Sequence, residues 1–151
     1  MKLTKLFALT LVLSLSMSSY SAQIKKLQKR ITVENESIPK NIGKKNTVLI
    51  CVLTGRESRD KYMKMHVKNI YKGEYILVLE SELNSSKYSD LGKFKYLFDY
   101  DRSGTIDTPS SEYYIKDRES GKYYRSHISS SSFGKLIQVY TTQMENARLN
   151  N

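Results

Sequence analysis

The sequence contains one cysteine, two histidines and two prolines among its 151 residues. Because Cys51 is alone, an internal disulfide is excluded and stability must come from packing. Cys51 lies in the apolar run 48–53, which indicates a small buried side chain. Burial among aliphatic residues raises the pKa of a thiol, so this position does not suit a nucleophile.

A recognisable catalytic constellation is also missing. Two histidines can hardly supply the three or four clustered ligands of a zinc site, and we expect His66 and His127 at solvent-facing strand positions. A Ser-His-Asp triad would require a strained elbow or an oxyanion-hole signal, and neither accompanies the serines. The sequence therefore favours a protein that binds rather than one that catalyses.

Residues 1–22 have the layout of a secretory signal peptide. Lys2 and Lys5 precede the apolar stretch 6–15, and small polar residues then lead to Ala22. A helix needs about 20 apolar residues to cross a bilayer, and this apolar stretch is shorter. Cleavage after Ser21 fits the small-residue rule slightly better than cleavage after Ala22. We therefore expect a secreted or periplasmic protein.

Basic residues outnumber acidic residues by ten. The leader holds two of the 25 Lys and Arg residues and none of the 15 Asp and Glu residues, so the mature chain would carry +8. Such a charge favours an anionic glycan, a lipid surface or an acidic protein as partner, although lysines spread along a chain also simply keep it soluble. Two local clusters stand out before residue 47: Lys25, Lys26, Lys29 and Arg30, then Lys40, Lys44 and Lys45.

We divide the mature chain into a basic polar N-terminal arm, residues 23–46, and a single domain, residues 47–151. In the arm, Ile24, Leu27 and Ile31 have helical spacing, while residues 31–33 fit a strand equally well. The structure of the arm is therefore left open.

The pattern from residue 47 onward predicts strands. The run 48–53 is typical of a central strand buried on both faces. Apolar residues alternate over 63–68, and a turn at Lys72-Gly73 would join this segment to 75–79 as a hairpin. Aromatic residues at every second position over 94–100 predict another strand. Residues 113–116 and 122–128 predict a second hairpin.

The C-terminal part has helical spacing instead. One stripe contains Phe133, Leu136, Ile137, Tyr140 and Met144, and serines 129–132 offer N-cap candidates. Strands followed by a helix indicate an α+β fold. We therefore expect an antiparallel β-sheet of about five or six strands with a C-terminal amphipathic helix packed on one face.

The segment 99–107 resembles the first nine positions of an EF-hand calcium loop, with Gly104 at position six. Position twelve is Ser110 instead of glutamate, and the preceding aromatic alternation favours a strand over an entering helix. An ordinary β-turn over 101–104 is the other interpretation. If calcium binds, the resemblance implies these ligands: Asp99, Asp101, Ser103, Asp107 and the carbonyl of Thr105. No other cofactor is expected.

Eleven of the twelve tyrosines lie between residues 62 and 140, often beside lysine or arginine. In the adjacent pairs 113–114 and 123–124, one ring must point into the core and the other to the opposite sheet face. Such a surface can stack on sugars or bases.

The leading hypothesis is a small, basic, non-enzymatic binding or accessory domain that uses its exposed sheet face and its arm. Two alternatives remain. One is a weak calcium-binding protein through residues 99–107. The other is an extracellular hydrolase in which Asp99, Asp101 and Glu112 pair across neighbouring strands.

Overall fold

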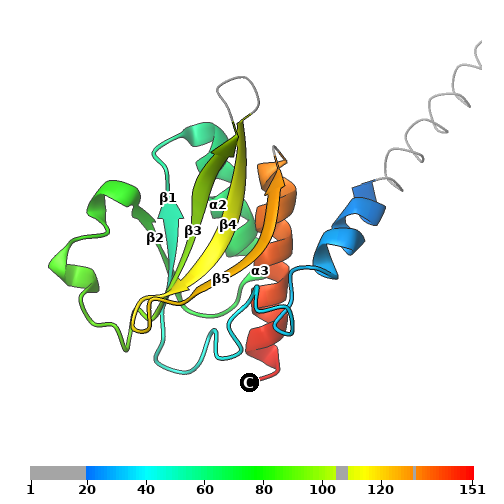
Figure 1. Ribbon diagram of the computed structural model, residues 1–151. Coiled ribbons are helices and arrows are strands. Elements are labelled where there is room, and N and C mark those ends of the chain that lie inside the picture. Colours follow the sequence, from blue (N-terminus) through cyan, green and yellow to red (C-terminus); the bar gives the residue numbers. More distant parts are fainter. Residues whose placement is uncertain (1–19, 105–108, 131) are drawn as a thin grey trace, which may run out of the picture.

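A computed structural model describes residues 20–104, 109–130 and 132–151. Residues 20–28 are helical, and the chain then reaches a five-stranded sheet with two further helices (Figure 1). In chain order the elements are β1 (Leu49–Leu53), α2 (Glu57–Ile70), β2 (Tyr75–Leu79), the 3₁₀ turns η1 (Glu80–Glu82) and η2 (Ser86–Tyr88), β3 (Tyr96–Gly104), β4 (Pro109–Asp117), β5 (Tyr123–Ser130) and α3 (Phe133–Leu149).

The sheet has the strand order β2-β1-β3-β4-β5 and is mixed. Strand β1 pairs in parallel with β2 and with β3. Its pairing with β2 is parallel because α2 carries the chain back from the end of β1 to the start of β2. Strands β3, β4 and β5 are antiparallel neighbours. The carboxyl ends of β1, β2 and β3 therefore lie at the same end of the sheet.

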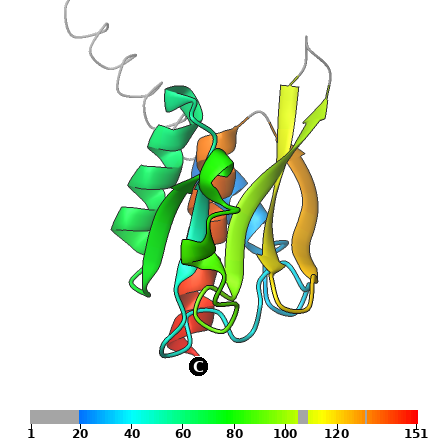
Figure 2. The same cartoon turned by 90° about the vertical axis from the view of Figure 1, so that its left-hand side faces the viewer.

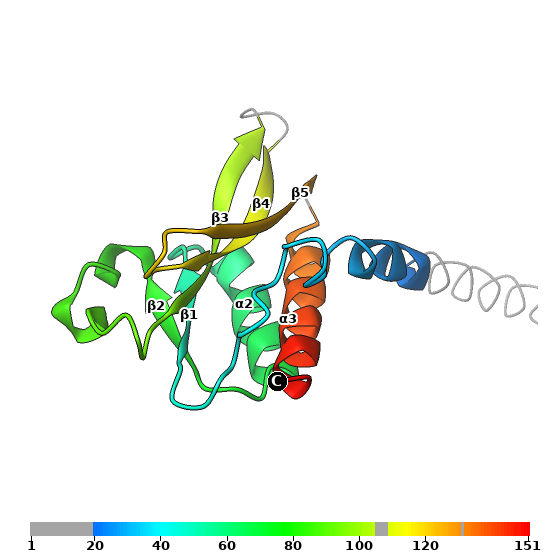
Figure 3. The same ribbon diagram turned by 60° about the horizontal axis from the view of Figure 1, so that its bottom comes forward.

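Helices α2 and α3 cover one face of this sheet, as Figure 3 shows. The main core between the layers joins β1, α2, β3, β4 and α3, and aromatic residues fill much of it. The Phe98 ring lies 5.8 Å from Tyr113 and 5.5 Å from Tyr140 between ring centroids. A second apolar cluster lies on the other face, where Leu83, Tyr88 and Phe94 cover Ile50 and Val52. The predicted α+β fold with a C-terminal helix is confirmed.

The strand predicted over 63–68 is wrong, since these residues belong to α2. In the helix the buried positions are Asp60, Met63 and Val67, spaced three and four apart. Met65, which created the period of two in the sequence, is 44% exposed. The hairpin predicted at Lys72-Gly73 is consequently wrong as well, because β2 pairs in parallel with β1 after a helical crossover.

The second hairpin and the central strand are confirmed by β4–β5 and by the fully buried β1. The β-turn considered over 101–104 is wrong, because β3 continues to Gly104 in register with Pro109. Cys51 is completely buried, as expected, and burial raises the pKa of its thiol.

The predicted N-terminal arm contributes three isoleucines to the main core. Ile31, Ile38 and Ile42 are each at most 1% exposed there. Gly43 has a φ of +70°, and a Cβ atom at this position would lie 2.4 Å from Cγ of Arg148. The segment 31–43 therefore packs into the main core, and at Gly43 it contacts Arg148 near the C-terminal end of α3. In the described part of the chain, none of the helices is long and apolar enough to span a membrane.

Candidate functional surfaces

The first basic cluster forms one side of the helix at residues 20–28 and of the turn that follows it. Lys25 and Lys29 are four residues apart, as are Lys26 and Arg30, and all four side chains are exposed. Positions with this spacing share one side of a helix. We call these four residues the cationic helix face. Ile24 and Leu27, on the opposite side, pack against the main core.

Hydrogen bonds attach this helix to α3. The side-chain amide of Gln143 donates to the backbone carbonyl of Gln28 at 2.7 Å, and Lys135 donates to the side-chain carbonyl of Gln23. The apolar stripe and these bonds fix which side of the helix is turned outward. The cations are therefore presented on the outside of a structured segment.

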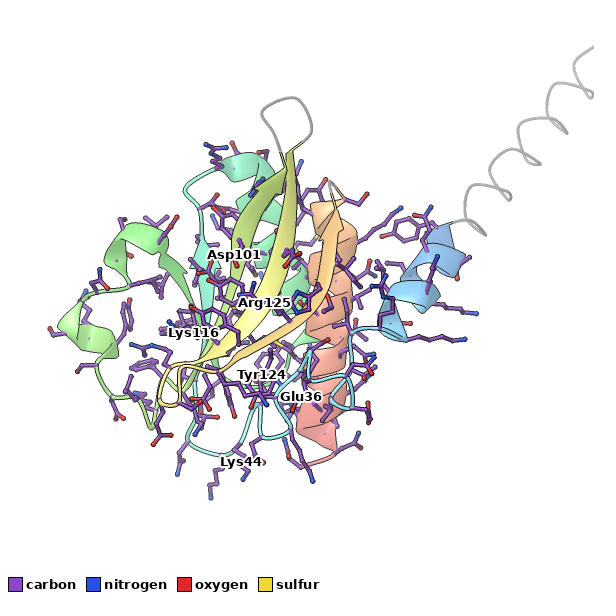
Figure 4. All side chains as sticks on the ribbon, in the orientation of Figure 1. Glu36, Lys44, Asp101, Lys116, Tyr124 and Arg125 are labelled. Carbon is purple, nitrogen blue, oxygen red and sulfur yellow. The ribbon has the colours of Figure 1, made fainter. Side chains whose placement is uncertain are left out.

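Residues 25–45 carry seven Lys and Arg residues against two Glu residues, a net charge of +5 out of +10 for the chain. All seven basic side chains are exposed, and Figure 4 shows Lys44 projecting away from the domain. Among the residues that the structure describes, no ion pair involves any of the seven. Their charges remain available to an external anion.

Several cations near the sheet have acidic partners instead. Lys95 lies 2.7 Å from Glu119, and Lys122 lies 2.9 Å from Glu36. Arg125 on β5 lies 3.1 Å from Asp101 on β3, reaching across β4 (Figure 4). Exposed ion pairs of this kind contribute little stability, but they lower the positive potential of the surface. The positive charge of these three residues is therefore partly neutralised, whereas the seven basic residues of 25–45 have no such partner in the described structure.

The face of β3, β4 and β5 turned away from the helices carries a patch of aromatic and charged side chains. We call it the outer patch. The Arg125 guanidinium lies 5.2 Å from the Tyr114 ring centroid and 4.9 Å from that of Tyr123, and Lys116 lies 5.1 Å from the latter. Tyr123 is 44% exposed and Tyr114 is 7% exposed.

The adjacent tyrosines point to opposite faces, as expected. Tyr113 is buried in the main core and Tyr124 packs partly against it, whereas Tyr114 and Tyr123 belong to the outer patch. Of the two outward rings, only Tyr123 is substantially exposed. Arg125 was missed as a bridging residue, because its contact with Asp101 joins strands that are not neighbours.

Asp99 lies at the edge of the outer patch with both carboxylate oxygens occupied. It accepts hydrogen bonds from the Tyr100 amide at 2.8 Å and the Tyr114 hydroxyl at 3.0 Å. Burial, the largest effect, raises the pKa of Asp99, and the negative charges of Glu80 and Asp101 raise it further. The two hydrogen bonds act in the opposite direction.

The predicted calcium ligands are spread along β3 and beyond it. Asp99, Asp101 and Ser103 occupy alternate positions of the strand, whereas Thr105 and Asp107 lie outside the described residues. Within residues 20–104, 109–130 and 132–151, no group of three His, Cys, Asp or Glu residues is arranged to hold a metal ion. Calcium binding by 99–107 stays a prediction.

The carboxylates of the hydrolase alternative do share one face of the sheet. Asp101 is the cross-strand partner of Glu112. One guanidinium nitrogen of Arg125 lies between them, at 3.1 Å from Asp101 and 3.9 Å from Glu112. Arg125 thus forms ion pairs with both of these carboxylates.

The histidines lie in different environments. His66 is on α2, where its ring stacks on Tyr62 and burial lowers its pKa. The strand position predicted for it is therefore wrong, because residues 57–70 are helical. His127 is exposed on β5, as predicted, and has a φ of +51°.

A cavity of about 430 Å³ lies at the carboxyl ends of β1 and β2, lined by Thr54, Gly55, Leu79, Glu80 and Ser81. The sequence analysis missed this cavity because it predicted a strand over 63–68, which would follow β1 in the chain and pair with β2 as a hairpin. Open sheets with parallel strands often bind ligands at such carboxyl ends.

Comparisons with protein-family models, with curated proteins and with solved structures find no match for this chain.

Proposed function

We propose that the protein is an exported, non-enzymatic binding domain whose cationic helix face attaches it to an anionic partner outside the cytoplasm. The observation that supports this function is the exposure of Lys25, Lys26, Lys29 and Arg30 without ion pairs in the described structure. Half of the net charge of the chain lies within residues 25–45.

The predicted leader agrees with this placement. Cleavage after Ser21 or Ala22 would leave all four cations close to the new N-terminus. The new α-amino group, with a pKa near 8, would add positive charge at neutral pH. N-terminal sequencing of the protein recovered from the periplasm or the medium should begin at Ala22 or Gln23. A chain retained in the cytoplasm with Met1 intact would contradict export.

The binding mode should be electrostatic, because the apolar side of the helix faces the domain. Ile24 and Leu27 are engaged with the core and cannot insert into a bilayer without unpacking. Attraction between exposed charges falls as salt rises, with a Debye length of about 8 Å at physiological ionic strength. We therefore expect binding that weakens steeply with added salt.

Retention on a sulfated polysaccharide resin tests the proposal. The variant carrying Lys25→Gln, Lys26→Gln, Lys29→Gln and Arg30→Gln should elute at lower salt than the unchanged protein. A matched control removes four exposed lysines elsewhere: Lys61→Gln, Lys64→Gln, Lys68→Gln and Lys87→Gln. Anionic vesicles and an acidic protein resin, used in parallel, identify the class of partner. Equal retention of both variants on every support would contradict the proposal.

A further inference from the structure

Strand β2 is an edge strand with a free backbone edge. The Leu49 amide donates to the carbonyl of Glu74, and Leu49 is in register with Tyr75. In a parallel ladder this directs the backbone groups of Ile76 and Val78 toward β1 and those of Tyr75, Leu77 and Leu79 outward. In the part of the chain described, no backbone hydrogen bond reaches residues 75–79 from the side away from β1.

Three of the features by which proteins often protect such an edge, namely proline, lysine and a β-bulge, are not present within β2. The strand reads Tyr-Ile-Leu-Val-Leu, with neither proline nor lysine, and its register with β1 is regular. Leu77 and Leu79 are 37% and 40% exposed and belong to neither apolar cluster. Figure 2, which looks toward this side of the molecule, shows β2 as the outermost strand.

Unpaired acidic residues surround this edge in a protein that is otherwise basic. Glu74 and Glu80 flank the strand and Glu82 follows, all exposed. None of the three takes part in an ion pair within the described residues. The cavity of about 430 Å³ adjoins the end of the strand, with Leu79 and Glu80 in its wall.

We propose that the β2 edge is a docking site for an extended peptide that adds a sixth strand and carries basic residues at its ends. Main-chain hydrogen bonds from Tyr75, Leu77 and Leu79 would hold the peptide backbone, as in other cases of strand addition. The cavity would accept a lysine or arginine side chain, whose apolar stem lies along Leu79 while its charge meets Glu80.

A second copy of this chain fits the edge less well than a basic peptide. In an antiparallel pair centred on Leu77, Tyr75 would face Leu79 of the other copy, and Glu74 would face its Glu80. Like charges placed directly opposite each other destabilise a strand pair, and this contact would occur twice. Basic ends on the partner would turn both repulsions into attractions.

The probe is a nine-residue synthetic peptide of alternating valine and threonine with two lysines at each end. Fluorescence anisotropy should show binding to the purified protein, and amide hydrogen exchange should slow at Tyr75, Leu77 and Leu79. A peptide N-methylated throughout its central part cannot donate the backbone hydrogen bonds and should not bind. A peptide with glutamates in place of the lysines should also fail.

Two variants should each weaken binding of the lysine-ended peptide about tenfold. This is the change in affinity expected when one charge-assisted contact, or several weaker contacts, are lost. Glu80→Lys removes the acidic wall of the cavity, and Leu77→Lys places a charge on the edge. Glu34→Lys changes the charge of an exposed residue away from β2 by the same two units as Glu80→Lys, and it should bind as the unchanged protein does. Circular dichroism confirms that each variant is folded.

Equal affinity for the N-methylated peptide would overturn the proposal, as would protection of amides elsewhere than in β2. Concentration-dependent dimerisation without peptide, lost in Leu77→Lys, would identify a second copy as the occupant and overturn it as well. The cationic helix face is not involved, so the four-residue glutamine variant should bind the peptide normally. Failure of the anion-binding proposal can therefore be distinguished from failure of this one.

Discussion

The Tyr140 hydroxyl lies 2.7 Å from the backbone carbonyl oxygen of Tyr113 and donates a hydrogen bond to it. The same hydroxyl accepts a hydrogen bond from the Ser126 amide at 3.1 Å. The ladder between β4 and β5 is shifted here, between Glu112 and Tyr114. Helix α3 thus supplies hydrogen bonds to backbone groups beside a β-bulge.

Replacing Tyr140 by phenylalanine should lower the free energy of unfolding by about 1–3 kcal/mol. The ring would still fill its place beside Phe98, but the Tyr113 carbonyl and the Ser126 amide would lose their partner. Urea denaturation measures the change. Tyr123→Phe removes an exposed hydroxyl and should alter stability by less than about 0.5 kcal/mol. Equal effects of the two substitutions would contradict this role for Tyr140.

Asp60 joins the end of β1 to the first turn of α2. Its buried carboxylate accepts hydrogen bonds from the Thr54 amide at 2.9 Å and the Thr54 hydroxyl at 3.0 Å. Asp60→Ala should cost about 2–3 kcal/mol in the free energy of unfolding, because a carboxylate accepts stronger hydrogen bonds than a neutral group. Glu57→Ala, on the exposed side of the same turn, should cost less than about 1 kcal/mol. Thermal or urea denaturation of both variants distinguishes them.

Asp99 should make stability depend on pH. Burial raises its pKa in the folded state above the unfolded value, so the folded protein favours the protonated form. Its contribution is most favourable below the unfolded pKa, and it is lost as pH rises through the folded value. Asp99→Asn should therefore be at least as stable as the unchanged protein at pH 7, with a smaller decline in stability from pH 4 to pH 7. A lower Tm for the variant at pH 7 alone would argue against this interpretation.

The calcium hypothesis makes its own prediction. If residues 99–107 bind calcium, a concentration tenfold above Kd should stabilise the protein by about 1.4 kcal/mol and raise its Tm. Asp101→Asn should abolish the rise, while Asp117→Asn, outside the segment, should retain it. Titration calorimetry at millimolar calcium that shows no heat, together with an unchanged Tm, would remove the hypothesis.

The features predicted correctly are those with a strong local pattern. Five apolar residues at helical spacing were enough to predict α3, and β1 was recognisable as a continuous aliphatic run. Period two also predicted β3, together with the opposite directions of adjacent tyrosines. In these segments the local period and the packing agree.

Helix α2 was missed because its sequence supports two periods. Met63 and Val67 fit a helix and a strand equally, and the exposed Met65 tipped the pattern toward a strand. The parallel pairing of β1 with β2 could then not be foreseen, nor the cavity at their carboxyl ends. The buried isoleucines of residues 31–42 were missed because they lie in an irregular segment without a period.

The lysines and arginines could be counted in the sequence, but the sequence does not show which of them form ion pairs with acidic residues. Lys25 and Lys122 appear equally basic, and only the fold shows that Lys122 is held by Glu36. Arg125 on β5 likewise reaches Asp101 on β3 because only one strand, β4, lies between them. Such pairings depend on register, which side-chain patterns do not determine across non-neighbouring strands.

The most direct measurement is the salt concentration at which the two four-residue glutamine variants elute from the sulfated polysaccharide resin. Both lose four positive charges, so a difference between them reports where the charge lies. Binding through the cationic helix face predicts that the variant at residues 25, 26, 29 and 30 elutes well before the control variant at residues 61, 64, 68 and 87. Elution of the two variants at the same salt concentration would contradict the account.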